Sequence, residues 1–174
     1  MSEPDSVQTA IDSLGILARR RIEAEILAPV YEELKAEIGV EGARAILRKA
    51  VRRAAISAGE AFAAKAPGDV NLETFRAIQP LWTKDGALVV ETLTATAEAY
   101  DFNVRRCRYS ETYKQMGLAE IGGLLSCNRD GAFCEGYDRR LKLTRTQTIM
   151  EGADHCDFRY RLEDPSPAAA SEPK

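Results

Sequence analysis

The sequence predicts an α+β domain in which N-terminal helices are followed by the order ββ-αα-ββ, giving a four-stranded antiparallel sheet with helices packed on one face. Two observations predict this class. Before Pro80 the chain is rich in alanine and its apolar residues recur at helical spacing, whereas after Pro80 it is rich in threonine, aromatic residues and cysteine and alternates as strands do. A length of 174 residues with 45% hydrophobic content suits one domain with a closed core.

The folded domain is expected over residues 7–162. Residues 1–6 are polar, and residues 163–174 combine three prolines with small and charged side chains. Such compositions cannot bury enough apolar surface to offset chain entropy, so both ends are predicted to be disordered.

The first half is predicted to hold three helices. An amphipathic helix ends at Gly39, a residue that suits a left-handed cap, and its apolar residues are Ile22, Ile26, Val30, Leu34 and Ile38. Pro29 removes a backbone donor, so a kink is expected near residues 24–29. Whether this helix packs within one subunit or across a homodimer stays open from sequence.

The second predicted helix covers residues 41–65, and a third, capped by Asp69 or Asn71, covers residues 72–78. The expected apolar side of the second helix consists of Ala43, Ile46, Leu47, Ala50, Val51, Ala54 and Phe62. Further helices are expected at residues 111–116, 119–125 and 129–135.

Strands are predicted at residues 87–95, 100–109, 141–150 and 156–162. On the third strand Arg145 shares a face with Leu143 and Ile149, so its guanidinium points toward the core and needs an anion there. On the fourth strand Cys156 faces inward together with Phe158. The partner of Arg145 is either an internal carboxylate, with Asp130 and Glu91 as candidates, or a bound one.

Composition excludes several classes of function. A net charge of -3 offers no basic stripe, so nucleic acid is not an expected partner. There is no apolar run of membrane-spanning length and no export signal at the start, so the chain is expected to be cytoplasmic and not membrane-bound. In that compartment four cysteines indicate thiols or ligands rather than a disulfide framework.

Two stretches resemble the L-2-amino-thiazoline-4-carboxylic acid hydrolase family. They read YDFNVRRCRYSETYKQMGLAEIGGLLSCNRD and LKLTRTQTIMEGADHCDFRY, within a likeness that spans roughly residues 20–162. Members of that family are taken to open a cyclic isothiourea to N-carbamoyl-L-cysteine. The resemblance implies a hydrolase that acts on carbon-nitrogen bonds, other than peptide bonds, in a small cyclic amidine or related cyclic amide.

A more distant likeness links the last two strands to the 4-vinyl reductase domain. Ligand-sensing members of that group hold a metal with Glu-x-x-Cys on the third strand and further cysteines. Here Arg145 stands in place of the glutamate and Thr148 in place of the cysteine. Zinc is therefore disfavoured and no cofactor is expected. A metal protein that uses Cys127, Cys156 and His155 remains an alternative.

The implied chemistry needs a nucleophile or base, a carboxylate clamp and an acid. The catalytic candidates are Cys127, Asp130, His155 and Asp157, and the substrate-binding candidates are Asn128, Arg129, Arg145 and Cys156. Cys127 follows a predicted helix, where nearby amides or Arg129 would stabilise a thiolate. Arg145 is the expected clamp, His155 with Asp157 the acid/base pair, and Asp130 an orienting group or water activator. A small-molecule sensor or carrier without catalysis is the other alternative.

Overall fold

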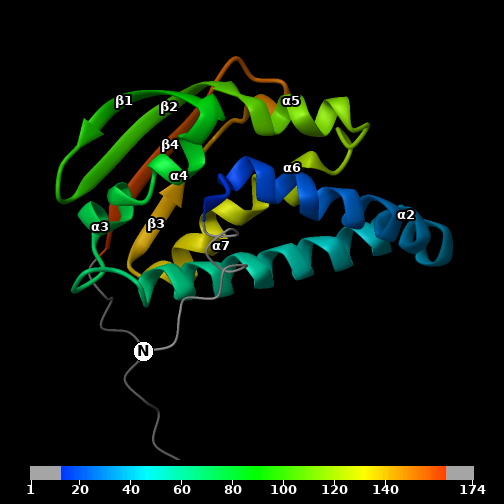
Figure 1. Cartoon of the computed structure of the whole chain (residues 1–174), viewed down its shortest axis with the longest axis horizontal. Helices are drawn as coiled ribbons and strands as arrows, with labels where there is room; N and C mark the ends of the chain where they lie inside the picture. The colour runs from blue at the N-terminus through cyan, green and yellow to red at the C-terminus, as the bar shows by residue number, and fades with distance from the viewer. Residues whose placement is uncertain (1–12, 164–174) are drawn as a thin grey trace, which may run out of the picture.

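The computed structural model describes residues 13–163, which form a four-stranded antiparallel sheet with helices packed on it (Figure 1). The predicted α+β class is confirmed. The expected disordered ends fall, apart from residue 163, outside the described residues. Within residues 13–163, no helix combines the length and the apolar character needed to cross a membrane.

The elements follow the chain in the predicted order, with one short helix and two 3-10 turns added. They are α2 (Ile16–Ala63), α3 (Leu72–Ala77), α4 (Pro80–Thr83), η1 (Lys84–Gly86), β1 (Leu88–Ala95), β2 (Ala99–Cys107), α5 (Arg108–Gln115), α6 (Gly122–Leu125), α7 (Asn128–Tyr137), β3 (Leu141–Thr144), η2 (Ile149–Glu151) and β4 (Cys156–Leu162). The cap of α3 is Asn71, whose side chain accepts from two backbone N–H groups of the first turn.

The strand order is β1-β2-β4-β3, and each neighbouring pair is antiparallel. In the register of β2 with β4, Val104 pairs with Cys156 and Phe102 pairs with Phe158. Cys156 is buried, as predicted, so this row of side chains forms the inner face of the sheet.

Strand β3 is shorter than predicted, because it ends at Thr144 and not near residue 150. The carboxylate of Asp157 on β4 accepts hydrogen bonds from the backbone N–H groups of Thr146 and Gln147, each at 2.9 Å. The side chain of Asp157 therefore replaces the backbone carbonyl groups as acceptor for these N–H groups, and β3 stops pairing with β4 at this point.

Helix α2 is a hairpin of two antiparallel arms (Figure 1). The break lies at Gly39, whose φ of 77° is the left-handed conformation that favours glycine. Gly39 was the predicted end of the first helix. The predicted kink near residues 24–29 is wrong in its position, because Pro29 lies within helical backbone and the break comes later.

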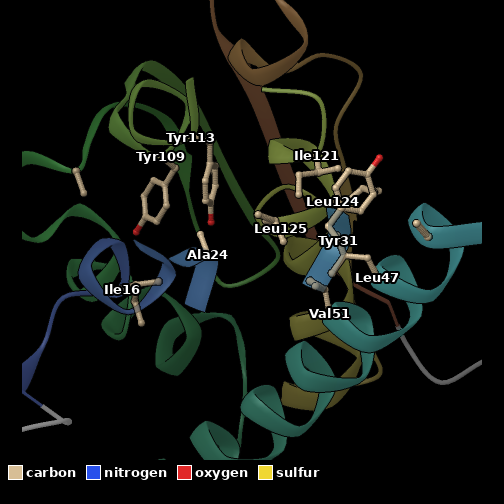
Figure 2. Close-up of a cluster of buried hydrophobic side chains, with 12 residues drawn as sticks. Ile16, Ala24, Tyr31, Leu47, Val51, Tyr109, Tyr113, Ile121, Leu124 and Leu125 are labelled. Atoms are coloured by element: carbon tan, nitrogen blue, oxygen red, sulfur yellow. The ribbon is translucent and has the colours of Figure 1, made fainter. Parts of the chain in front are cut away.

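The apolar face predicted for the first arm is also wrong. Ile22, Ile26 and Val30 are 55%, 68% and 43% exposed, while Ala24 and Tyr31 are buried. Figure 2 shows the cause: Tyr109 and Tyr113 extend from α5 toward the side of α2 that carries Ile16 and Ala24. The small Ala24 leaves room for these rings, so packing selects the alanine face over the isoleucine face.

The apolar face predicted for the second arm is correct in part. Its buried residues are Ala43, Leu47, Val51, Ala55 and Gly59, whereas Ile46, Ala50 and Ala54, which were expected inside, are exposed. The prediction is thus confirmed for Ala43, Leu47 and Val51, and the buried face continues through Ala55 and Gly59 instead of extending to Ile46, Ala50 and Ala54.

Helices α2 and α7 touch through their backbones. A Cβ atom added to Gly59 would lie 2.2 Å from the carbonyl oxygen of Phe133, and one added to Gly136 would lie 2.0 Å from the carbonyl oxygen of Ile56. Real Cβ contacts are never this short, so both glycines are required by the crossing. The crossing fixes α7, and with it Asp130 and Phe133, against the sheet.

Replacing Gly136 by alanine is expected to lower the free energy of unfolding by about 2 kcal/mol or more, because the helices must separate to admit the methyl group. Gly131→Ala is the matched control in the same helix, where a Cβ meets nothing within 4 Å. It should be neutral or stabilising by up to about 1 kcal/mol through helix propensity. Urea denaturation of both variants measures the difference, and equal stabilities would contradict the backbone contact.

Candidate functional site

A cavity of about 110 Å³ lies between the inner face of the sheet and helices α2, α4 and α7. Most of its wall is apolar and much of it aromatic. The aromatic residues of the wall are Phe62, Phe75, Trp82, Phe102, Tyr109, Phe133, Phe158 and Tyr160. Their rings also pack on one another, as with Phe133 and Trp82 at 5.2 Å between centroids. The wall is therefore a continuous aromatic surface that suits a flat or apolar molecule.

Polar groups gather in one part of this wall. They are Arg20, Ser126, Cys127, Arg129, Asp130 and Arg145, with the thiols of Cys107 and Cys156 also lining the cavity. The structure thus brings five of the eight candidate residues together: Cys127, Arg129, Asp130, Arg145 and Cys156. We call this group, with Arg20 and Ser126, the polar end of the cavity.

The centre of the polar end is the ion pair between Arg145 and Asp130. Arg145 donates through Nη1 to Asp130 Oδ2 and through Nη2 to the carbonyl oxygen of Cys127 at 3.1 Å. Its guanidinium also lies over the ring of Phe158, 5.0 Å from the centroid. The internal carboxylate expected for Arg145 is therefore Asp130, while Glu91 pairs with Arg105 instead.

Burial raises the pKa of Asp130, and the guanidinium of Arg145 opposes that shift. The side chain of Asp130 is 24% exposed, but it lines the cavity, so this surface faces the cavity more than bulk water. Since a guanidinium does not deprotonate, Arg145 holds the carboxylate ionised while leaving it more basic than an exposed one.

A second group of charged residues, formed by Arg129, Arg20 and Glu23, adds further ion pairs at the polar end. Arg129 donates through Nη2 to Glu23 at 2.8 Å and through Nε to the carbonyl oxygen of Leu125 at 2.8 Å. Arg20 donates to the same carboxylate oxygen of Glu23. The polar end and its partner Glu23 therefore hold three arginines against two carboxylates, an excess that favours an anionic group on a ligand.

The thiols that line the cavity are not activated. Burial, with the Asp130 carboxylate adding to it, raises the pKa of Cys127 to about 12, and burial raises the pKa of Cys107 to about 11. The pKa of Cys156 is also raised by burial. The expectation that Arg129 or helix amides stabilise a Cys127 thiolate is thus not met, because desolvation outweighs the nearby guanidinium of Arg145.

Three candidate residues do not line the cavity. His155 contacts Asp154 through Nδ1 at 2.5 Å and lies beside Gln147. Asp157 holds the backbone at Thr146, as described above, and Asn128 donates through Nδ2 to the carbonyl oxygen of Arg48 at 3.2 Å. The structure gives these side chains places in loop and helix contacts, and the predicted His155–Asp157 acid/base pair is not assembled at the cavity.

Sequence reasoning missed Arg20, Ser126 and the aromatic wall. Arg20 stands in a run of three arginines that resembles a solvated helix face, and Ser126 precedes Cys127 without any motif of its own. No signal in the sequence distinguishes the aromatic residues that face the cavity from those that only fill the core. Across residues 13–163, no three His, Cys, Asp or Glu side chains are grouped so that they could hold a metal ion.

Comparison with known proteins relates the chain to one family and to one fold. The sequence model of the family described as L-2-amino-thiazoline-4-carboxylic acid hydrolase matches residues 19–160. No functionally curated protein matches the sequence.

Among solved structures, the phenol-responsive sensory domain of the transcription activator PoxR with phenol is similar with a TM-score of 0.52 and 15% identity, over 80% of this chain and 73% of that one. A trafficking protein particle complex subunit 3 from Naegleria fowleri, covalently bound to palmitic acid, has a TM-score of 0.47 and 12% identity over 84% and 96% of the two chains. At such identities the PoxR match shows a shared fold alone.

The raised pKa of Cys127 predicts slow alkylation of this thiol in the folded protein. Relative to the ordinary thiol value of 9.0, a pKa of about 12 lowers the thiolate fraction near neutral pH about a thousandfold. The labelling rate of Cys127 by iodoacetamide, followed by peptide mass spectrometry, should still rise above pH 10 in native protein but level off in urea. Fast labelling of native protein at neutral pH would contradict the buried, neutral thiol.

The Arg145–Asp130 pair is expected to stabilise the fold. Arg145→Met should lower the free energy of unfolding by about 3 kcal/mol, because it leaves a buried carboxylate without a partner. The double variant Arg145→Met with Asp130→Leu should cost less than the sum of the two single changes. Arg105→Met, which removes the half-exposed pair with Glu91, should cost under about 1 kcal/mol. Additive effects at Arg145 and Asp130 would argue against the pair.

Proposed function

We propose that this chain, which belongs to the L-2-amino-thiazoline-4-carboxylic acid hydrolase family, hydrolyses a small cyclic amidine, isothiourea or related cyclic amide in the cavity. The observation that carries the proposal is the Arg145–Asp130 pair, which places a basic carboxylate and fixed cations at one end of an apolar cavity. The family match over residues 19–160 supports the reaction class.

In the proposed reaction Asp130 accepts a proton from water while the water oxygen attacks the amidine carbon of the ring. The protonated Asp130 then returns the proton to the ring heteroatom as its bond to that carbon breaks, so the ring opens and the carboxylate is regenerated. A carboxylate whose pKa is raised by burial suits both steps, because it is a stronger base and then an effective acid.

Arg145 and Arg129 hold the substrate's carboxylate or another anionic group in this proposal. The excess of guanidinium over carboxylate at the polar end supports that assignment. In this proposal Cys127 contributes a neutral thiol beside the reacting carbon. For Cys127 to act as the nucleophile, as the sequence suggested, Asp130 would first have to remove the proton of its thiol. We expect no metal or other cofactor to take part, because Arg145 and Thr148 stand where the resemblance to ligand-sensing 4-vinyl reductase domains would place a metal-binding glutamate and cysteine.

The wall of the cavity indicates what else the substrate carries. L-2-amino-thiazoline-4-carboxylate is small and polar, whereas the cavity beyond the polar end is lined by aromatic rings. Burying apolar surface against such a wall is favourable, so we expect the preferred substrate to bear an aromatic or branched aliphatic substituent.

A second candidate function is binding without catalysis, as in a small-molecule sensor or carrier. The specific observation in its favour is that the three thiols of the cavity all have raised pKa values, so no preformed nucleophile is present. A solved structure of similar fold is a phenol-responsive sensory domain. Such a function would use the cavity and Arg145 but not the basicity of Asp130.

The test incubates the protein with L-2-amino-thiazoline-4-carboxylate and with aryl-substituted cyclic isothioureas, dihydrouracils and hydantoins, and follows product mass. Asp130→Asn should lower kcat/KM by about a hundredfold to ten-thousandfold while calorimetry still detects binding. Asp101→Asn, which alters a carboxylate paired with Arg161 away from the cavity, should leave kcat/KM unchanged.

Cys127→Ser separates the two routes for the nucleophile. Retained turnover supports attack by water, and lost turnover with retained binding supports attack by sulfur. If members of the panel bind and none is turned over, the hydrolase proposal fails and the binding function replaces it.

A further inference from the structure

Two tyrosines line the cavity, and the fold uses the hydroxyl of only one of them. Tyr109 donates its hydroxyl hydrogen to the carbonyl oxygen of Trp82 at 3.1 Å. Tyr160 is 4% exposed, yet its hydroxyl makes no hydrogen bond to any residue from 13 to 163. A buried hydroxyl without a partner costs free energy, and such groups are rare in folded proteins. The hydroxyl of Tyr160 therefore requires an explanation other than the stability of the fold.

The space beside the hydroxyl of Tyr160 is the cavity itself. Tyr160 lies on the inner face of β4 and forms part of the cavity wall. The hydroxyl of Ser110 also lacks a partner among residues 13–163, but protein atoms enclose it fully, whereas the hydroxyl of Tyr160 keeps contact with open space. A ligand in the cavity can therefore accept a hydrogen bond from Tyr160.

Tyr160 lies beside the polar end. It follows Phe158 on the same face of β4, and the two rings stack with their centroids 6.1 Å apart. The guanidinium of Arg145 lies over the ring of Phe158, 5.0 Å from its centroid. The charges of Asp130 and Arg145 both act on the hydroxyl of Tyr160. This hydroxyl is thus near the carboxylate that is proposed to activate water.

The hydroxyl of Tyr160 is a neutral donor. Burial raises the pKa of Tyr160 well above the ordinary tyrosine value, and the charge of Asp130 acts in the same direction while Arg145 opposes it. A raised pKa keeps the phenol protonated at neutral pH and above, so the hydroxyl retains the hydrogen that it would donate.

We propose that the hydroxyl of Tyr160 is a catalytic hydrogen-bond donor to the substrate atom on which negative charge accumulates when water adds to the amidine or amide carbon. This inference rests on the proposed hydrolysis. As the water oxygen forms its bond to the carbon, the electrons of the C=N or C=O bond move to the nitrogen or oxygen, and a fixed donor stabilises that charge. The phenol keeps its own proton throughout, so Asp130 alone takes up and returns the proton of water.

The same assignment restricts the form of the substrate that reacts. An acceptor for Tyr160 needs a lone pair, which a neutral amidine nitrogen or an amide oxygen has and a protonated amidinium lacks. The polar end with Glu23 holds three arginines against two carboxylates, and this excess of positive charge also disfavours a cationic group. The reacting group is therefore a neutral amidine or amide.

Two conservative variants with opposite expected effects test the role of Tyr160. On the cyclic isothioureas, dihydrouracils and hydantoins used above, Tyr160→Phe should lower kcat by about tenfold to a thousandfold and change KM by less than about threefold. Tyr137→Phe is the matched control, because the hydroxyl of Tyr137 donates to Thr74 Oγ1 at 2.9 Å and Tyr137 is not among the residues that line the cavity. Tyr137→Phe should leave kcat and KM unchanged but lower the midpoint of urea denaturation, whereas Tyr160→Phe should not lower that midpoint.

A substrate analogue tests which atom accepts the hydrogen bond. In a thioamide analogue, sulfur replaces the oxygen on the carbon that water attacks, and sulfur is a weak acceptor. Tyr160→Phe should therefore reduce kcat/KM at least about five times less on the thioamide than on the matching cyclic amide. An equal reduction on both compounds would contradict a hydrogen bond to that atom.

The wild-type rate separates a failure of this inference from a failure of the proposed function. If the wild-type chain hydrolyses a member of the panel and Tyr160→Phe is equally active, the role of Tyr160 is overturned while the hydrolase proposal stands. If Tyr160→Phe lowers the urea midpoint as Tyr137→Phe does, the hydroxyl serves the fold and the inference is overturned as well. If the wild-type chain hydrolyses none of these compounds, the proposed function fails and the catalytic role of Tyr160 fails with it.

Discussion

The structure depends on the backbone contact between α2 and α7. Because Gly59 and Gly136 carry no side chain, the two helices approach until a Cβ on either would meet a carbonyl oxygen at 2.2 Å or less. That approach places α7 directly beneath the sheet, which brings Asp130 to Arg145 and Phe133 to the aromatic wall. A wider crossing would carry Asp130 away from its partner, so the polar end exists only because the two glycines permit it.

The cavity shows how burial decides between competing electrostatic effects. Arg145 lies close enough to Cys127 to favour a thiolate, yet desolvation and the Asp130 charge act together in the other direction and prevail. The same burial makes Asp130 more basic without neutralising it, because Arg145 cannot give up its proton. One ion pair therefore moves the chemistry from sulfur toward a carboxylate and water.

The sequence alone predicted those features that depend only on residues close together in the chain. Gly39 ends the first arm, Asn71 caps α3, and alternation on β4 places Cys156 inside. Features set by long-range packing were not accessible in this way. The end of β3 depends on a carboxylate from another strand. His155 and Asp157, predicted as an acid/base pair, do not line the cavity, and Asp157 holds Thr146 instead. Arg145 was correctly placed inside, but its choice of Asp130 over Glu91 required the helix crossing.

The error on the first arm of α2 has a physical meaning of its own. Spacing of four residues shows that a helix has an apolar face, but it does not show which surface covers that face. Here the core covers Ala24 and Tyr31, because rings from α5 fit against the small side chain, and Ile22, Ile26 and Val30 remain outside. The apolar face that the spacing indicates is present on the helix, but the chain's own core covers a neighbouring face. The periodic signal was therefore correct about the helix and wrong about the face that the core buries.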